Sequence, residues 1–391
     1  MQIHPLITTT ESLKDFCALI AKSDFIAVDT EFMRENTFWP ELCLIQVADS
    51  NHAAAIDPLA NGIDLAPLMA LLVDNEDMLK VFHAGGQDVE IIFNITGKTP
   101  HPIFDTQIGA MALGQAEQVG YSNLVEAWAG VTLDKGARFT DWSRRPLDKR
   151  QIDYAIGDVT HLAQIFPRML QKLIKTGRGH WLDEEMEKLA DPANYSVDPD
   201  KAWQRIKQPS KKPEVLGRLQ ALAAWREREA RGKNLPRGRI VKDETLADIA
   251  AHPPRSQDDL GKVRGLSATW KTNDIGGRLM DALADAKPLP RDAMPQAGPR
   301  GPGLGKDGVL VGDLLKLLLK IRTRELNMAS RLVARSDDLE QLAAGVREGL
   351  SLLRGWRYDV FGKDALELVE GRMGFAVRGG KLVMTRTEVD A

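Results

Sequence analysis

The sequence predicts an α/β domain, with a mixed sheet flanked by helices, followed by two all-helical domains. Three apolar runs lie close together near the N-terminus, FIAVDTEF (25–32), LCLIQVAD (42–49) and HAAAID (52–57), and each has the length of a β-strand. Helical and strand-like segments alternate after them, and this order is typical of a mixed sheet covered by helices. From residue 214 onwards the apolar periodicity is helical, apart from the tail FAVRGGKLVM, which predicts a small hairpin.

Composition marks the boundaries between these domains. Polar and proline-containing stretches, DPANYSVDPD and KQPSKKP, end the α/β part, and the tract KPLPRDAMPQAGPRGPGLG has the composition of a linker. We therefore expect four parts, at 1–205 (α/β), 210–288 (helical), 289–305 (linker) and 306–386 (helical).

The two helical domains resemble each other. WREREARGKNLPRGRIVKDETLADIA, at 225–250, aligns with IRTRELNMASRLVARSDDLEQLA, at 321–343. Each has a long basic amphipathic helix, an arginine and apolar residues, and then an acidic helix start. Two copies of one unit would explain this pattern, and chance resemblance between amphipathic helices remains the alternative.

Charge is distributed unevenly along a chain whose net charge is −3. Residues 1–202 carry 17 Lys and Arg against 30 Asp and Glu, whereas residues 203–300 carry 20 against 12. An acidic first domain and a basic middle domain are consistent with carboxylate chemistry in one and a polyanion-binding surface in the other. Two ordinary solvated surfaces would give the same counts.

Cysteine content and hydropathy argue against several classes of protein. The two cysteines, Cys17 and Cys43, have no paired spacing, so neither a disulfide framework nor a zinc knuckle is expected. No signal-peptide core or membrane-spanning run is present, and we expect a cytoplasmic protein. PGLGKDG lacks the spacing of a phosphate loop and has Asp307 where Ser or Thr is needed, so no nucleoside triphosphate is expected.

Two carboxylates stand inside the apolar run FIAVDTEF. Side chains alternate across a strand, so Asp29 and Glu31 should point to the same face. Two unpaired charges facing a core would cost on the order of several kcal/mol, and ligation of a cation would offset that cost.

Three other residues complete a set with this pair. Asp88 lies near the start of a helix that follows a strand, and Tyr154 and Asp158 share one face of a later helix at i and i+4. Each fragment alone is weak, because solvent-exposed strand ends and helix surfaces carry such residues too. Together they suit a phosphodiesterase with two Mg²⁺ or Mn²⁺ ions about 4 Å apart, beside a phenol that orients the attacking water.

These motifs resemble the DEDD superfamily of 3′→5′ exonucleases, in the subgroup with tyrosine in the third motif. The histidine subgroup would place His at position 153, which is Asp here. LCLIQVAD, IFDTQIGAMAL, GYSNLVEAWAG and DWSRRPLDKRQIDYAIGDVTHL are similar to the ribonuclease D family, and the two helical domains are similar to the HRDC modules that follow its nuclease domain. The resemblance covers essentially the whole chain.

The resemblance implies an RNase H-like fold and trimming of RNA 3′ ends, typically those of tRNA precursors, with release of 5′-mononucleotides. Asp29, Glu31, Asp88 and Asp158 would hold the metal ions and Tyr154 would position the water. The second motif, HAGGQD, departs from the pattern of the family. Gly85 and Gly86 stand where larger side chains are common, so we expect a more mobile loop before Asp88.

Basic residues supply candidate contacts to the substrate. A run of cations with interleaved aromatics leads into the helix of Tyr154, and a second cluster lies in the first helical domain; such groups suit phosphate contact and base stacking, and a solvated loop is the alternative. The candidates are Arg138, Trp142, Arg144, Arg145, Arg150, Arg228, Lys233, Arg237 and Arg239.

Other acidic and histidine residues near the motifs have structural interpretations. Asp105 is expected to be a helix N-cap, and His83 and His161 to be hydrogen-bonded structural residues. We thus expect a monomeric exoribonuclease. A DNA exonuclease would use the same carboxylates, and a non-catalytic nucleic-acid adaptor would use the helical domains alone.

Overall fold

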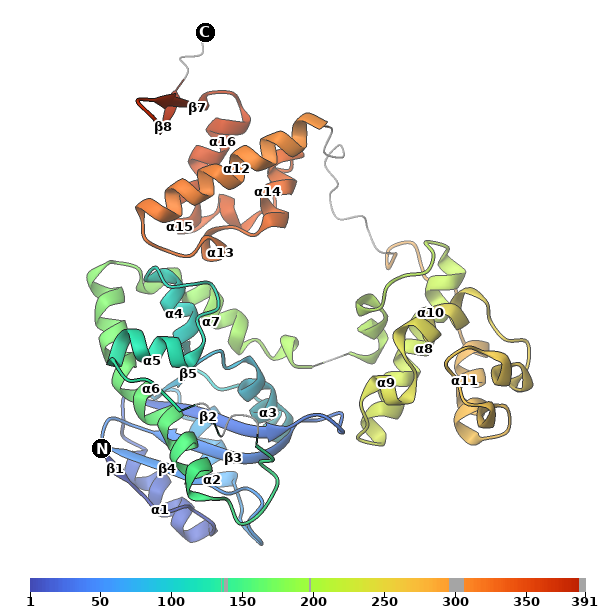
Figure 1. Ribbon diagram of the computed structural model, residues 1–391. Coiled ribbons are helices and arrows are strands. Elements are labelled where there is room, and N and C mark those ends of the chain that lie inside the picture. Colours follow the sequence, from blue (N-terminus) through green and yellow to red (C-terminus); the bar gives the residue numbers. More distant parts are fainter. Residues whose placement is uncertain (135, 137–139, 197, 295–305, 387–391) are drawn as a thin grey trace.

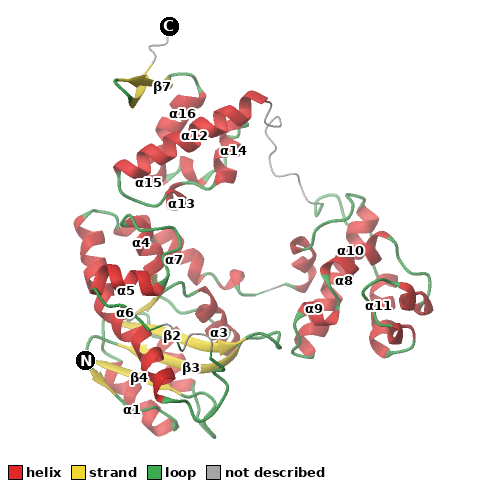
Figure 2. Ribbon diagram, in the orientation of Figure 1, coloured by secondary structure: helices red, strands yellow, loops and turns green. Residues whose placement is uncertain are grey.

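A six-stranded mixed sheet forms the centre of the N-terminal domain (Figures 1 and 2). The computed structural model describes residues 1–134, 136, 140–196, 198–294 and 306–386. The strands are β1 (Gln2–Ile3), β2 (Phe25–Met33), β3 (Glu41–Ala48), β4 (His52–Ile56), β5 (Leu79–Phe82) and β6 (Ile103–Asp105), in the order β1-β4-β3-β2-β5-β6. β3 pairs antiparallel with β2 and β4, and the other pairs are parallel, which confirms the predicted mixed sheet.

Seven α-helices of the described chain flank this sheet. They are α1 (Thr10–Ile20), α2 (Ala66–Val73), α3 (Gly86–Thr96), α4 (Thr106–Ala112), α5 (Tyr121–Ala129), α6 (Lys149–Lys175) and α7 (Asp183–Ala190). The longest, α6, packs across β2, β3 and β4 (Figure 1). Its start is fixed by a capping box, in which Asp148 accepts from the Gln151 N–H and the Gln151 side chain accepts from the Asp148 N–H.

The register of β2 sets the orientation of its two carboxylates. Asp29 lies opposite Gln46 and Glu31 opposite Leu44 on β3, and a β-bulge follows between Glu31 and Phe32. Because alternate residues share a face, Asp29 and Glu31 both face α6 rather than the helices on the other side of the sheet.

The first helical module has its own hydrophobic core. It contains α8 (Pro213–Gly232), α9 (Arg237–Ile240), α10 (Asp243–Ala251) and α11 (Asp274–Ala284). Trp203, which precedes the boundary expected from composition, and Leu289, which follows it, both pack into this core. Phe38 from the β2–β3 loop also joins it, and the N–H groups of Phe38 and Trp39 donate to Asn234 Oδ1, each over 3.1 Å.

The second helical module ends in a small antiparallel hairpin. Its elements are α12 (Lys306–Glu325), α13 (Ser330–Val333), α14 (Ser336–Ala343), α15 (Gly355–Arg357), a π-helical turn (Tyr358–Gly362), α16 (Lys363–Val369), β7 (Met373–Arg378) and β8 (Lys381–Arg386). Gly379 and Gly380 have φ of 56° and 74°, the positive values that a tight two-residue hairpin turn requires. The predicted hairpin around these glycines is confirmed.

The second module packs directly on the N-terminal domain. Buried apolar residues of both form one continuous core, and α13 lies against α4. The rings of Trp181 and Trp356 stack with centroids 4.6 Å apart, and the Ala329 N–H donates to the Met111 carbonyl over 2.8 Å. Within the described ranges, no helix has the length and apolar character needed to cross a membrane.

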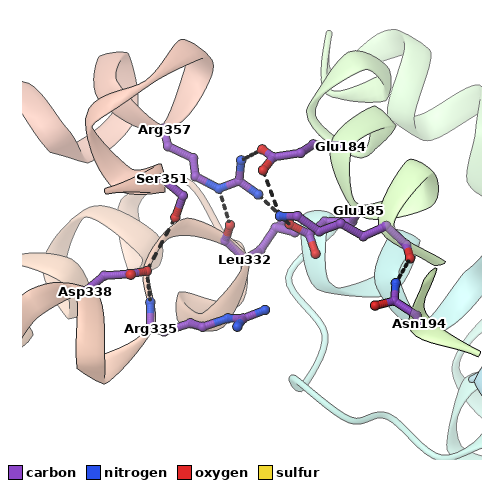
Figure 3. Close-up of polar contacts among 9 residues, drawn as sticks. Glu184, Glu185, Asn194, Leu332, Arg335, Asp338, Ser351 and Arg357 are labelled. Carbon is purple, nitrogen blue, oxygen red and sulfur yellow. Dashed lines mark hydrogen bonds and ion pairs between the residues drawn. The ribbon is translucent and has the colours of Figure 1, made fainter. Parts of the chain in front are cut away.

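Arg357 is the buried ionic link of this interface. Its guanidinium binds the carboxylates of Glu184 and Glu185 on α7, the latter at 2.7 Å, and donates to the Leu332 carbonyl over 3.0 Å (Figure 3). Only 4% of Arg357 is exposed. It therefore joins α7 to α13 across the domain boundary.

Replacing Arg357 by Ala should loosen the second module. Loss of charged hydrogen bonds at a buried site costs about 2 kcal/mol, less where the partner carboxylate is solvated, as Glu184 is. We expect a lower Tm and faster proteolysis of residues 306–386. Lys363→Ala, at an exposed site of the same module, is the control; an identical effect of both changes would contradict the role of Arg357.

Candidate active site

Three carboxylates meet where β2 passes beneath α6. Asp29, Glu31 and Asp158 each offer an oxygen, and these oxygens all lie within 4.8 Å of one another. The pair on β2 shares a face by strand alternation, and α6 brings Asp158 over it. Hard oxygen ligands at this separation fit a divalent cation such as Mg²⁺ or Mn²⁺.

The electrostatics of the cluster favour a bound cation. Burial raises the pKa of Asp29 well above its ordinary value, and the charges of Asp88, Asp158 and Glu31 raise it further, while the Thr30 backbone N–H lowers it. The ionised cluster is therefore costly by itself. A divalent cation removes that cost because it supplies the missing positive charge.

Asp88 lies behind the cluster, in the first turn of α3. It accepts a hydrogen bond from the Thr30 hydroxyl, and burial raises its pKa to about 7. Among the described residues it stands outside the 4.8 Å group, although its charge acts on Asp29. The structure thus brings three of the four predicted ligands together and places the fourth, Asp88, in a hydrogen bond with Thr30, the residue between Asp29 and Glu31.

The loop before Asp88 is held in place rather than left loose. The N–H groups of Ala84 and Gly85 donate to the carboxylate of Asp105, over 3.1 and 2.9 Å. A Cβ on Gly85 would approach the Phe82 Cβ to 2.4 Å, so glycine is needed there for close packing. These contacts argue against the greater mobility expected from the two glycines. Asp105 also caps α4 through the Gln107 N–H at 2.7 Å, which confirms the predicted N-cap.

Tyr154 faces the carboxylates across a shared cavity. This active-site cavity has a volume of about 460 Å³, and its walls include Asp29, Glu31, Tyr154 and Asp158. Its size is within the range of small-ligand sites, roughly 300–1,000 Å³. Trp142 packs beside Tyr154, with ring centroids 6.2 Å apart, and only 3% of Trp142 is exposed. The expectation that Trp142 stacks on a base is therefore wrong, since its buried ring instead supports Tyr154.

Tyr121 is a site residue to which the sequence analysis gave no role. Its hydroxyl donates to the carbonyls of Gly157, over 3.1 Å, and of Asp158. Burial raises its pKa well above the ordinary value, and the nearby Asp158 and Asp29 charges add to this. The phenol thus stays protonated and ties α5 to the turn of α6 that carries Asp158. In the sequence, the segment GYSNLVEAWAG carries only a similarity to the ribonuclease D family and no recognisable ligand pattern.

The two histidines near the site differ. His83 is hydrogen-bonded at both ring nitrogens, to Thr106 Oγ1 and to the Val119 carbonyl, each over 3.0 Å, as predicted for a structural residue. His161 departs from the prediction, because its buried Nδ1 has no hydrogen-bond partner within the described chain. Burial lowers the pKa of both, so both rings are neutral near pH 7.

Arg145 supports the chain rather than facing the cavity. Its Nε and Nη2 donate to the two oxygens of Asp57, each over 2.7 Å, and further donors bind the carbonyls of Cys43 and Trp142 over 2.6 and 2.8 Å. With these donors engaged, the substrate contact expected of Arg145 is replaced by a structural role. The guanidinium fixes the segment that leads into α6.

The other basic candidates lie at the surface, mostly in ion pairs. Arg144 binds Asp141 at 3.0 Å and Arg150 binds Asp134 at 3.3 Å, whereas Arg138 lies outside the described residues. In the first module the pairs are Arg228 with Asp200, Lys233 with Glu229, and Arg237 with the buried Glu227. Arg239 is exposed and forms no ion pair with a described carboxylate.

Known proteins match this chain over nearly its full length. Residues 5–174 match the family model of a 3′-5′ exonuclease, and residues 215–283 match that of the HRDC domain. The ribonuclease D of Sphingobium indicum is 72% identical over 99% of this chain and 100% of its own. The chain belongs to the ribonuclease D family. The family's enzyme from Zymomonas mobilis subsp. mobilis is 62% identical over the same shares.

Solved structures agree with membership of the ribonuclease D family. The crystal structure of Escherichia coli RNase D, described as an exoribonuclease involved in structured RNA processing, has a TM-score of 0.77 and 31% identity, and the match covers 95% of this chain and 99% of that one. A protein from Bifidobacterium adolescentis, 22% identical with a TM-score of 0.68, shares the fold. This protein is therefore a 3′→5′ exoribonuclease of a family that depends on divalent metal ions.

Tyr121→Phe should weaken catalysis by releasing the Asp158 turn of α6. Loss of a residue that orients a metal ligand typically costs about 10–100-fold in metal affinity or activity. We expect a lower kcat and a higher Mg²⁺ or Mn²⁺ concentration for half-maximal activity. Tyr195→Phe is the matched control, because its hydroxyl also donates to a carbonyl, that of Leu189 at 2.7 Å, outside the cavity. Equal metal dependence of the two variants would refute the positioning role.

The stability of the metal-free protein should fall as pH rises from about 4 to 7. The folded pKa of Asp88, about 7, lies above the ordinary 3.8, so between these values the unfolded chain releases a proton that the folded protein keeps. The loss is on the order of 4 kcal/mol, and added Mg²⁺ or Mn²⁺ should reverse it above pH 7.

Thermal unfolding at pH 5 and pH 8, with EDTA or with Mg²⁺, measures this effect. Asp88→Asn should remove the part of the pH dependence that belongs to Asp88. An EDTA-treated protein whose pH dependence is the same with and without this substitution would contradict the assigned pKa.

Proposed function

We propose that this enzyme shortens RNA from the 3′ end by hydrolysis assisted by two divalent cations, and that it releases 5′-mononucleotides. The observation that carries this proposal is the group of Asp29, Glu31 and Asp158 oxygens within 4.8 Å, in the cavity that Tyr154 also lines. We propose tRNA precursors as its RNA, a monomer as the active form and the cytoplasm as its compartment.

Each side chain of the site has one part in this reaction. Asp29, Glu31 and Asp158 would hold one cation, and Asp88, which accepts a hydrogen bond from the Thr30 hydroxyl, would help to hold the second. Bound Mg²⁺ or Mn²⁺ would supply an activated water and neutralise charge on the phosphate and the leaving 3′-oxygen. Tyr154 would form a hydrogen bond with the attacking water, as donor or as acceptor, and so orient it. Trp142 keeps the Tyr154 ring in place.

We also propose that residues 306–386 are a second HRDC-like unit. Its elements follow the same order as in residues 215–283: a long helix, a one-turn helix and a short helix. In each unit an asparagine follows the long helix with φ of 48°, Asn234 in the first and Asn327 in the second. A left-handed asparagine at one position of both units supports a common origin over chance. Because Trp203 and Leu289 pack into the core of the first helical module, we place the domain limits at 1–198, 199–289 and 306–386.

The surface cations of the first unit would contact RNA phosphates through exchangeable ion pairs. Arg228, Lys233 and Arg239 retain solvent exposure, and surface pairs of this kind are worth about 0–1 kcal/mol, so a phosphate can displace the carboxylate. Arg144 and Arg150, beside the start of α6, would do the same near the cavity. Arg237 is less available, since it binds the buried Glu227 and lies over the Phe38 ring.

Asp29→Asn should abolish hydrolysis and leave the protein folded. The change removes a metal ligand and also one of several clustered negative charges, so the metal-free variant should be at least as stable as wild type. Stepwise shortening of 5′-labelled RNA with Mn²⁺ measures activity. Asp153→Asn, on the exposed side of α6, is the control. Turnover by Asp29→Asn within tenfold of wild type would contradict the assignment of Asp29 as a metal ligand.

Matched RNA and DNA strands decide between the proposal and its rivals. The proposal predicts faster degradation of the RNA strand, from its 3′ end. Equal or faster degradation of the DNA strand would favour a DNA exonuclease. Binding of both strands without release of mononucleotides would favour a non-catalytic adaptor.

A further inference from the structure

A polar cleft separates the N-terminal domain from the second helical module and adjoins the active-site cavity. It has a volume of about 550 Å³, and Gln107 lines both this cleft and the active-site cavity. A third hollow of about 590 Å³, along α12, shares Glu117, Arg331 and Arg335 with the cleft. The three hollows therefore form a row that begins at the carboxylate cluster.

The walls of this cleft are fixed relative to each other. Arg357 joins the second module to α7, and Trp181 stacks on Trp356 with an interplanar angle of 5°. Nearby, Arg178 donates to the Ala112 carbonyl over 2.6 Å and to the Asn327 carbonyl over 3.3 Å. One module thus presents its side chains to the other at a defined distance, as a binding groove requires.

The carboxylates that line the cleft already bind protein groups. Glu185 is held by Arg357 at 2.7 Å, and Asp338 accepts from the Arg335 N–H over 3.3 Å and from Ser351 (Figure 3). Glu117 accepts from the Arg331 N–H over 3.1 Å. These contacts engage part of the negative charge of the cleft in interactions with the protein.

Several cations of the row, in contrast, have no acidic partner. Arg331 lies in α13 and Arg335 directly precedes α14, four residues later. Both are exposed, and neither guanidinium forms an ion pair with any carboxylate in the described ranges. Figure 3 shows the Arg335 side chain extending from the second module towards the N-terminal domain. On α12, Lys316 and Lys320 both line the third hollow; Lys316 pairs with Asp313 at 3.3 Å, whereas Lys320 forms no ion pair with a described carboxylate.

We propose that this row is the path of the RNA strand upstream of its 3′ end. The inference rests on the proposed function, because a 3′-terminal nucleotide among the carboxylates must be joined to a strand that leaves the cavity. A single strand passing Gln107 would bring successive phosphates to Arg331, Arg335 and then Lys320. Cations without protein partners, aligned with an open groove, are the features that track a nucleic-acid backbone.

The test uses the full chain with Arg331→Gln and Arg335→Gln combined, on single-stranded RNA of two lengths. For an oligoribonucleotide of about 20 nucleotides, KM should rise about tenfold near 0.1 M salt. The slope of log KM against log salt concentration should fall by about 1.4, because each lost phosphate contact removes about 0.7 for a single strand. For a trinucleotide, too short to reach the arginines, kcat/KM should stay within about twofold of wild type.

The matched control combines Arg354→Gln and Lys363→Gln, two exposed cations of the same module that line neither hollow. It should leave KM and the salt slope on the long RNA unchanged. The path would be overturned if Arg331→Gln/Arg335→Gln behaved like this control, or if it slowed the trinucleotide as much as the long RNA. Absence of hydrolysis by the wild-type protein would overturn the proposed function itself.

Discussion

Mutual repulsion among clustered, half-buried carboxylates is the constraint on which the rest of the N-terminal domain depends. Asp29, Glu31 and Asp158 are held within 4.8 Å although each charge raises the cost of ionising the next. Such a cluster persists only if the surrounding structure prevents it from relaxing. A cation then finds its ligands already assembled, so binding does not have to order the chain.

Several residues outside the ligand set keep the carboxylates of the cluster in place. The register of β2 against β3 fixes the two strand carboxylates, and Tyr121 ties down the turn of α6 that carries Asp158. Arg145 binds Asp57 and three carbonyls, and so fixes the chain that enters α6. Asp105 binds the two N–H groups that precede α3 and Asp88. The site is thus maintained by hydrogen bonds from a wider shell than its ligand set.

The two helical modules stand in different relations to this site. The second shares a continuous hydrophobic core with the N-terminal domain and forms one wall of the cleft beside the cavity. The first has a separate core, which Phe38 of the β2–β3 loop enters. A firmly docked module suits a fixed path for the strand near the 3′ end. A module with its own core suits contacts with more distant parts of a structured RNA.

The sequence predicted those features that depend on neighbouring residues. Apolar runs of strand length indicated the strands, Gly379 and Gly380 indicated the hairpin, and Asp105 before Thr106 indicated an N-cap. The pairing of Asp29 with Glu31 on one face followed from strand alternation alone. Local patterns therefore carried the fold class and the identity of the carboxylates.

Contacts between distant residues could not be predicted in this way. Arg145 was expected to contact the substrate. Its actual partner, Asp57, lies 88 residues earlier, and the sequence does not show that the two residues meet. Trp142 was expected to meet a base, since nothing in the sequence shows that its ring is buried beside Tyr154. The docking of the second module rests on Arg357 and Glu184, which are 173 residues apart. Periodicity and motif spacing hold no information on such pairs.

The most direct measurement of the central claim is the anomalous difference density of crystals grown with Mn²⁺. A preassembled cluster predicts a strong peak bounded by the carboxylates of Asp29, Glu31 and Asp158, at metal–oxygen distances of roughly 2.0–2.3 Å. It also predicts that these side chains keep the positions they have here. Crystals with Mn²⁺ in the solvent but no peak among these carboxylates would contradict the account.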